Sequence, residues 1–209
     1  MLFYNTFYPF GAHIMGHSQA EKAETHQRIV DVAARRFREL GIEGISVADI
    51  MKEAGLTVGG FYKHFTSRDD LVVEALMASF AEIEESELTQ QPTLKKTIQA
   101  YLSEKHRDEV HSGCALSSLV NDVSRSTDDA REVYTQRLER SLLHIENQVP
   151  PEIDGNHRAK AILAYSACIG AMGLSRAVSD PKLSRQILNT VAAELISLFS
   201  AKQSQDSVA

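Results

Sequence analysis

The chain has 209 residues, a length that indicates one domain or a small domain joined to a larger one. Hydrophobic residues make up 43% and charged residues 24%, a globular balance that excludes a disordered or fibrous chain. No apolar run approaches the ~20 residues of a membrane-spanning helix. The first residues lack the basic start of a secretory signal, and 2 cysteines are too few for a disulfide framework. We therefore expect a cytoplasmic protein with no membrane partner.

The net charge of −6 is unevenly distributed along the chain. Residues 21–68 carry eight basic and seven acidic side chains, whereas residues 69–209 carry 14 basic and 21 acidic ones. An acidic body with a less acidic N-terminal part indicates two functions in one chain. Charge alone identifies neither of them.

Apolar residues recur with helical rather than strand periodicity throughout the chain. In the first predicted helix, Ile29 and Phe37 share one face, and Gly41 ends the helix. We predict nine helices, at residues 25–40, 47–54, 58–64, 71–88, 92–106, 114–119, 127–147, 156–177 and 181–201. The pattern predicts an all-α protein.

Residues 46–65 hold two short helices around a tight turn. Ser46 begins a capping-box pattern, Gly55 ends the first helix, and Thr57 can cap the second. This is the outline of a helix-turn-helix, whose second helix fits the major groove of B-DNA. The pair Gly59–Gly60 costs about 1 kcal/mol per residue in a helix, which is expected if a DNA backbone or base edge must approach closely. The alternative is that the glycines mark a plain loop.

TetR-type transcriptional regulators have an N-terminal DNA-binding domain that resembles the stretch RIVDVAARRFRELGIEGISVADIMKEAGLTVGGFYKHFTSRDDLVVEAL. The resemblance runs from Gln27 to Leu76 and includes the spacing of Ala33, Phe37 and Gly41 and the pattern A-G-L-T-x-G-x-x-Y-x-H-F. It implies a homodimeric transcriptional regulator with a three-helix DNA-binding domain and a C-terminal helical bundle. A repressor is favoured over an activator, because occupying an operator blocks polymerase without an activation surface.

The resemblance also assigns residues to the DNA interface. It implies that Tyr62 and His64 touch phosphates and that Ser46 and Arg68 anchor the DNA backbone. The residues that it places at base edges or the groove floor are Thr57, Val58, Gly59 and Lys63. Tyr62 and His64 have an alternative role in packing the small core. The expected DNA-binding residues are Ser46, Thr57, Val58, Gly59, Gly60, Tyr62, Lys63, His64 and Arg68. Among the arginines of the first helix, a solvated face is the favoured interpretation for Arg36 and Arg38.

A two-fold symmetric double-stranded operator places two such heads about 34–36 Å apart, so the dimer contacts must come from elsewhere in the chain. Residues 159–174 are apolar nearly all round, which indicates a helix buried on all sides. The last helix has a broad apolar stripe. The expected dimer-interface residues are Ile162, Ile169, Gly170, Gly173, Ile187, Val191, Leu195 and Leu198. The alternative is that both helices pack inside a monomer.

By resemblance, the C-terminal domain also encloses a small effector whose binding moves the two heads out of DNA register. The candidate lining is rich in Leu, Met, Tyr and Cys, which favours an aromatic or lipophilic ligand. These residues are Tyr101, Cys114, Leu116, Leu119, Tyr134, Leu138, Tyr165, Cys168 and Met172. Most of them fit an ordinary hydrophobic core equally well.

Cys114 supports a second interpretation within the same class of protein. It stands at the first turn of a predicted helix, beside a histidine, and a helix N-terminus favours the reactive thiolate. A repressor that senses oxidants or electrophiles is the hypothesis, and a buried small hydrophobe is the alternative.

The predicted organisation has three parts: an N-terminal extension (1–20), a helix-turn-helix domain (21–70) and a ligand-binding and dimerisation domain (71–209). No motif for a metal or cofactor stands out, and no catalytic constellation does, so we expect neither an enzyme nor a cofactor. The rival class is a helical small-molecule carrier, or an enzyme, without DNA binding. Such a protein has no need of Tyr62, Lys63 and Thr57 on an exposed helix.

Overall fold

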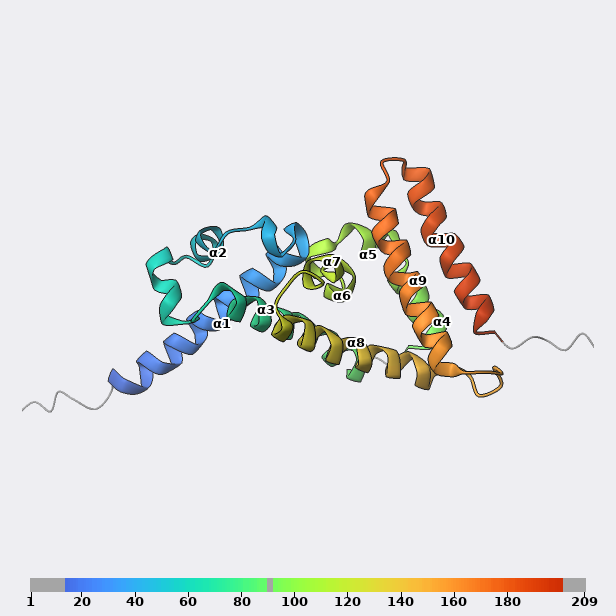
Figure 1. The fold of residues 1–209 in the computed structure, drawn as a ribbon, viewed down its shortest axis with the longest axis horizontal. Helices are drawn as coiled ribbons and strands as arrows, with labels where there is room; N and C mark the ends of the chain where they lie inside the picture. Colours follow the sequence, from blue (N-terminus) through green and yellow to red (C-terminus); the bar gives the residue numbers. More distant parts are fainter. Residues whose placement is uncertain (1–13, 90–91, 201–209) are drawn as a thin grey trace, which may run out of the picture.

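The computed structural model describes residues 14–89 and 92–200, which form ten α-helices, three short 3-10 helices and no strand (Figure 1). In chain order the elements are α1 (Ile14–Leu40), η1 (Ile42–Gly44), α2 (Val47–Glu53), η2 (Val58–Lys63), α3 (Arg68–Thr89), α4 (Leu94–Tyr101), α5 (Glu104–Asp108), η3 (Val110–Ser112), α6 (Ala115–Ser118), α7 (Val120–Val123), α8 (Asp128–Gln148), α9 (His157–Ala177) and α10 (Pro181–Leu198). The predicted all-α class is confirmed. Most of the predicted N-terminal extension, residues 1–13, lies outside the described residues.

The helix-turn-helix head is formed by α1, α2 and η2. Ser46 caps α2, because its hydroxyl accepts a hydrogen bond from the backbone N–H of Asp49 at 3.1 Å. Gly55 then turns the chain with a φ of 75°, a left-handed conformation that side chains disfavour. The chain emerges from this turn as η2, with Thr57 in extended conformation before it.

α3 joins the head to the body. Its start is fixed by a reciprocal cap, in which the Ser67 hydroxyl accepts from the N–H of Asp70 at 3.0 Å and the Asp70 carboxylate accepts from the N–H of Thr66 at 3.0 Å. From there α3 packs against α1 in the head and α8 in the body. One helix therefore belongs to both parts.

The body ends in an antiparallel pair, α9 and α10, at the opposite end of the molecule from the start of α1 (Figure 1). Asn156 caps α9 by accepting from the N–H of Ala159 at 3.0 Å. Asp180 caps α10, and Pro181 occupies its first turn, where a missing N–H costs nothing. None of the described helices is both long and apolar enough to cross a bilayer.

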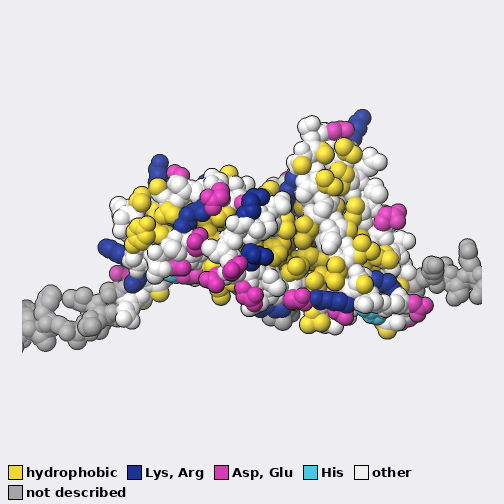
Figure 2. Space-filling view, viewed as in Figure 1, with side chains coloured by type: hydrophobic (Ala, Val, Ile, Leu, Met, Phe, Trp, Pro, Cys, Tyr) yellow, Lys and Arg dark blue, Asp and Glu magenta, His cyan; other side chains and the backbone are white. Residues whose placement is uncertain are grey.

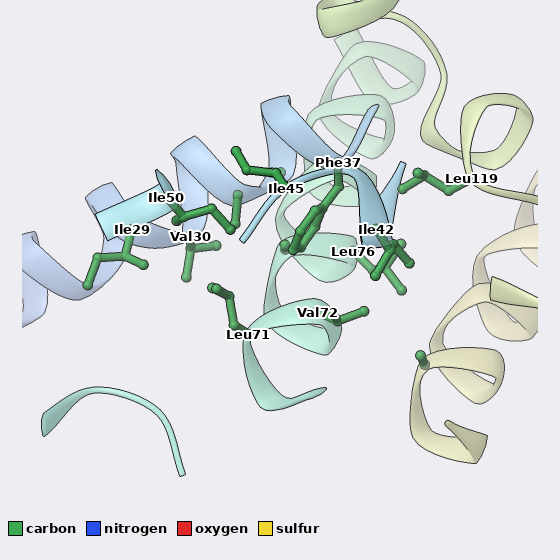
Figure 3. Packing of buried hydrophobic residues seen from close by; sticks show 14 of the residues in the cluster. Ile29, Val30, Phe37, Ile42, Ile45, Ile50, Leu71, Val72, Leu76 and Leu119 are labelled. Atoms are coloured by element: carbon green, nitrogen blue, oxygen red, sulfur yellow. The ribbon is translucent and has the colours of Figure 1, made fainter. Parts of the chain in front are cut away.

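Two hydrophobic cores hold the molecule together. The first runs from the head into the body. Figure 3 shows Ile29 and Phe37 of α1 and Leu71 of α3 in this core, with Leu119 of the body at the side nearest Phe37. The second fills the space between α4, α9 and α10, with Met172 and Leu188 fully buried in it. The predicted domain boundary at residue 70 falls at the start of α3, within the region that the first core spans.

The structure differs from the predicted helices in four places. α1 begins at Ile14 rather than at residue 25, so residues 14–20 of the predicted extension belong to this helix. The predicted helix 92–106 is divided into α4 and α5, because the Ser103 hydroxyl accepts from the N–H of His106 at 3.1 Å and caps a new helix. The predicted helix 58–64 is a 3-10 helix, which fits its two adjacent glycines. The predicted helix 114–119 is the four-residue α6, followed by a separate α7.

Candidate DNA-binding surface and effector region

η2 presents polar side chains outward from a buried aromatic anchor. Phe61 is 2% exposed and lies in the first core, whereas Tyr62 is 77% and Val58 51% exposed. Thr57 and Lys63 are exposed as well. The segment is therefore anchored in the core on its inner side and exposed to solvent on its outer side.

The two glycines of η2 have different surroundings. A Cβ at Gly59 meets no described atom within 4 Å, so this position lies at the open surface. A Cβ at Gly60 lies 3.7 Å from Cε of Met51, an ordinary contact with α2. Gly60 therefore faces the partner helix of the motif, and only Gly59 leaves its backbone bare for close approach.

The two expected phosphate anchors are already engaged within the head. The Ser46 hydroxyl donates to the Asp49 carboxylate at 2.6 Å in addition to its capping role. Arg68 donates to Glu43 at 2.7 Å and to the backbone carbonyl of Ile42. Contact of either residue with DNA stays a prediction, and for Arg68 it requires exchange of these partners.

His64 lies at a junction that sequence reasoning did not reveal. Its ring Nδ1 is buried with no hydrogen-bond partner among the described residues, and its ring centroid lies 5.9 Å from that of His26 on α1. Burial, followed by the nearby His26, Lys22 and Lys63, lowers the pKa of His64. His26 in turn hydrogen-bonds Glu74 at 2.5 Å.

A hollow of about 510 Å³ opens beside this junction and is lined by Glu21, Lys22, Thr25, Lys63 and His64. Lys22 and Lys63 thus flank one space although they are 41 positions apart in the sequence. The periodicity of α1 marks its buried face only, so it carried no signal that Lys22 and Thr25 adjoin η2. The hollow extends the candidate surface from η2 to the start of α1.

The interpretation of Arg38 as a solvated side chain is wrong. It is 7% exposed, donates from Nε to the carbonyl of His111 at 2.7 Å, and pairs with Glu82 at 3.2 Å. It therefore ties the end of α1 to η3 of the body. Arg36, by contrast, is half-buried and pairs with Glu53 at 2.7 Å on the head itself.

The expected effector residues lie along the seam between the two cores. Leu116 and Leu119 belong to the first core, with Tyr134, Leu138 and Tyr165 packed against it, and Cys168 and Met172 belong to the second, with Tyr101 packed against it. Neither the hollow beside η2 nor a second one beside α5 is lined by any of them. Whether they bind an effector stays a prediction.

The seam nevertheless contains an unusual polar group. The Tyr101 hydroxyl is buried and makes no hydrogen bond of ordinary geometry within the part of the chain that the structure describes, although the nearby Ser117 hydroxyl acts to lower its pKa. Burial, then the nearby thiol of Cys114, raises the pKa of Tyr101 well above its usual value. Burial raises the pKa of the Cys168 thiol to about 12. A buried, unpaired hydroxyl costs free energy unless a partner arrives.

Cys114 is half-buried and stands immediately before α6. Its backbone N–H donates to Nε2 of His106 at 3.1 Å, while Nδ1 of the same ring bonds the carbonyl of Tyr101 at 2.7 Å. The ring is thus the neutral tautomer with its proton on Nδ1. The His106 ring thus connects the backbone at Tyr101 to the backbone at Cys114.

The expected dimer residues divide into an open and a covered set. Ile162 is 46% exposed, and a Cβ at Gly170 or Gly173 meets no described atom within 4 Å. Leu195 is only 5% exposed and packs in the second core. Ile169, Ile187, Val191 and Leu198 are half-buried.

Three apolar side chains of this region are exposed although they are not among the expected dimer-interface residues. Leu163 is 56%, Leu174 59% and Leu183 42% exposed, on α9 and α10. Figure 2 shows hydrophobic side chains gathered over these two helices, with charged ones mainly at their ends. The open face of α9 and α10 is thus apolar and lined by small residues.

A capped helix-turn-helix with an anchored, outward-facing second element defines a DNA-binding protein of the helix-turn-helix class. Residues 29–75 match the family described as bacterial regulatory proteins, tetR family. AcrR of Shigella flexneri is 40% identical over 74 residues, which cover 35% of this chain and 34% of AcrR. TtgR of Pseudomonas putida is 27% identical over 169 residues, which cover 71% of this chain and 79% of TtgR.

The fold extends the likeness over nearly the whole chain. The crystal structure of a TetR-family transcriptional regulator from Cytophaga hutchinsonii matches with a TM-score of 0.73 at 18% identity, covering 88% of this chain and 98% of that one. The match to the tetR family therefore lies in residues 29–75, and the fold of nearly the whole chain is that of solved TetR-family regulators.

Proposed function

We propose that this regulator is a repressor that binds a two-fold symmetric operator as a homodimer and is released by a small lipophilic or aromatic effector. The observation that carries the proposal is the construction of η2. Phe61 fixes the segment in the core while Thr57, Val58, Tyr62 and Lys63 stand exposed on its outer side. A carrier or an enzyme gains nothing from such an exposed surface.

The head offers both kinds of contact that specific DNA binding needs. Thr57, Val58 and Gly59 lie at the open start of η2, where side chains and bare backbone reach base edges. Tyr62 and Lys63 suit phosphates, as does Lys22 across the hollow. Base contacts then choose the sequence, and phosphate contacts supply the salt-dependent part of the affinity.

The open face of α9 and α10 is the proposed dimer interface. Its exposed apolar side chains, Leu163, Leu174 and Leu183 among them, gain by leaving water, and Gly170 and Gly173 let a partner helix come close. A two-fold axis through this face pairs the two copies through the same residues. Leu195 contributes from within the protomer by supporting α10.

The proposed effector site is the seam around Tyr101. A ligand that supplies an acceptor or donor to the buried Tyr101 hydroxyl removes the cost of leaving it unpaired. The aromatic and aliphatic neighbours favour a largely apolar ligand. Because the seam lies between the core shared with the head and the core of α9 and α10, an inserted ligand shifts one relative to the other.

Selection of bound duplexes from a random DNA pool tests the proposal. We expect the enriched sequence to have two inverted half-sites whose centres are about one helical turn apart, or a multiple of it. Enrichment of a single asymmetric half-site contradicts the homodimer. Absence of enrichment, in a protein shown to be folded and dimeric, favours the carrier.

A second candidate is direct sensing by Cys114, favoured by its half-buried position among Tyr101, Tyr165 and Cys168. The thiolate sulfur adds to an activated alkene, forming a C–S bond, and the proton that the thiol gave up ends on the neighbouring carbon. N-ethylmaleimide is the probe. If the candidate holds, it releases wild-type protein from DNA but leaves a Cys114→Ser variant bound, and equal release of both contradicts it.

A further inference from the structure

A second hollow of the molecule, about 440 Å³ in volume, lies between α5, the end of α9 and the start of α10. Two guanidinium groups, Arg107 and Arg176, and one carboxylate, Asp108, line it together with Ser175, Ser179 and Ser184. Val178 and Pro181 add an apolar wall. None of these residues belongs to the proposed DNA, dimer or effector surfaces.

Arg176 is a half-buried cation without a carboxylate partner. Its Nε and Nη2 donate to the backbone carbonyls of Arg107 and His106, each at 3.0 Å. No carboxylate of the described residues lies within the 4.0 Å ion-pair distance of it. Two backbone carbonyls and the more distant charge of Asp108 therefore balance its charge, and Nη1 makes none of the hydrogen bonds named above.

Arg107 lines the same space, and its carboxylate partners are exposed to solvent. Its Nη1 donates to the Ser184 hydroxyl at 2.9 Å, which fixes the guanidinium against α10. Its Nε and Nη2 both donate to the Asp108 carboxylate, at 2.7 and 3.0 Å, and Nη2 also donates to Glu104 at 3.3 Å. The side chains of these two acids are 64% and 52% exposed. A bound acid therefore has to displace Asp108 from a two-point contact.

We propose that this hollow binds a small organic acid, whose carboxylate meets Arg107 and Arg176 and whose apolar part rests on Val178 and Pro181. Planar guanidinium forks match a carboxylate in geometry as well as charge. The apolar wall favours an organic acid over a bare inorganic anion. Ser179, exposed at the rim, adds a hydroxyl donor.

The hollow is placed to influence the head. Arg176 holds the final carbonyls of α5, and the next segment, η3, carries the His111 carbonyl that accepts from Arg38 of α1. A bound acid that shifts the Arg176 side chain therefore changes the hydrogen bonds that hold α5, and α5 is followed by η3, which is bonded to Arg38 of the head. This consequence rests on the proposed DNA-binding function, whereas binding of the acid does not.

Calorimetric titration of the DNA-free protein with benzoate and with benzamide, at constant ionic strength, tests the proposal. The two probes have nearly the same shape, and only benzoate is charged. We expect saturable benzoate binding with a dissociation constant of about 1 mM or tighter and at least tenfold weaker binding of benzamide. Equal binding of both, or none of benzoate, overturns the proposal.

Variants locate the site and separate it from the seam around Tyr101. Arg176→Gln keeps donors for the carbonyls but removes the charge, and we expect it to weaken benzoate binding at least tenfold. Ser179→Glu places a carboxylate at the exposed rim without touching the core, and it serves if Arg176→Gln fails to fold. Arg125→Gln, which removes an exposed cation between α7 and α8 and outside the hollow, is the matched control. Unchanged benzoate binding in Ser179→Glu, or in a folded Arg176→Gln, overturns the assignment.

Discussion

Lys63 and Tyr62 stand at the outer side of η2 and make no contact on which the fold depends. Lys63→Ala combined with Tyr62→Phe therefore removes a phosphate partner and a hydroxyl donor while the aromatic ring and the core remain. We expect DNA binding at least tenfold weaker, about 1.4 kcal/mol, and a nearly unchanged Tm. Fluorescence anisotropy with operator DNA and thermal unfolding measure the two quantities.

The matched control is Lys95→Ala, an exposed cation of α4 in the body. It removes the same charge far along the chain from η2, so its effect reports non-specific attraction alone. If both proteins lose affinity equally, or if neither does, η2 is not the surface that binds DNA.

His106 makes the stability of the body depend on pH. Burial is the main cause that lowers the pKa of His106 in the folded protein, and the neutral ring accepts from Cys114 while donating to Tyr101. The unfolded chain, with a histidine pKa of about 6.5, binds the proton more readily than the folded one. Stability is therefore fully present above that value and is lost as pH falls below it toward the folded pKa.

Thermal unfolding between about pH 7 and pH 5 measures this loss. We expect the Tm of the wild type to fall more steeply over this window than that of His106→Gln, which cannot gain the proton. His111→Gln replaces an exposed histidine nearby and retains the wild-type slope. Identical slopes for all three proteins contradict the role of His106.

Residues of the recognition segment could be predicted from the sequence because capping and turn residues act locally. Ser46 and Gly55 do what their spacing indicates. The surroundings of Arg38 could not be predicted, since its partners, Glu82 and His111, lie far along the chain. Sequence periodicity shows which face of a helix is apolar, and a buried charge on that helix leaves no mark in it.

At the scale of the element, the corner between α1 and α2 connects the head to the body. Gly41 takes a φ of 81° there, and a Cβ would lie 3.0 Å from the carboxylate of Asp122 on α7. That carboxylate accepts from the N–H of Ile42 at 3.1 Å. The bonds of Asp122 to Ile42 and of Arg38 to His111 therefore connect this corner of the head to the body.

Arg38→Leu removes the Arg38 part of this connection between head and body. The substitution keeps much of the buried side-chain volume but leaves the His111 carbonyl and the Glu82 carboxylate without their donor. We expect a loss of about 1–3 kcal/mol in the free energy of unfolding, measured by urea denaturation. Arg36→Gln breaks only pairs on the surface of the head, and we expect it to cost clearly less than Arg38→Leu. An equal loss of stability in the two variants contradicts the role of Arg38 in connecting the head to the body.

Element boundaries followed from the sequence where a cap or a turn residue stands at the end of a helix, as at Asn156 and Asp180. They failed at Ser103, a residue whose side chain either faces solvent within a helix or caps a new one. Tertiary contacts decide between the two, because α5 is held by Arg176 of α9. That information is absent from residues 92–106 themselves.

At the scale of the whole molecule, the open glycines of α9 separate assembly from folding. Gly170→Glu adds a side chain where no described atom lies within 4 Å, so the protomer accommodates it, but a partner helix cannot then approach. We expect the variant to be a folded monomer in sedimentation experiments, while Ala81→Glu, at an exposed position of α3, stays dimeric. A dimeric Gly170→Glu protein contradicts the proposed interface.

The head and body share one core, and this arrangement makes the molecule suited to regulation. A change at the seam around Tyr101, or at α5 and η3, reaches the head through packed side chains. A coupling free energy of roughly 1–3 kcal/mol between effector binding and DNA binding is enough to release an operator. Two heads must stay in register with the DNA. A small shift in each protomer therefore acts on both contacts at once.

The central claim is specific DNA binding by a protein whose overall charge is negative. Fluorescence anisotropy with the DNA that flanks its own gene, against a scrambled duplex and over a range of salt concentrations, tests it most directly. We expect a dissociation constant of about 10⁻⁸ M or tighter for the flanking duplex only, and an affinity that falls steeply as the salt concentration rises. Equal and weak binding to both duplexes, unchanged when apolar compounds are added, would contradict it and favour a helical carrier.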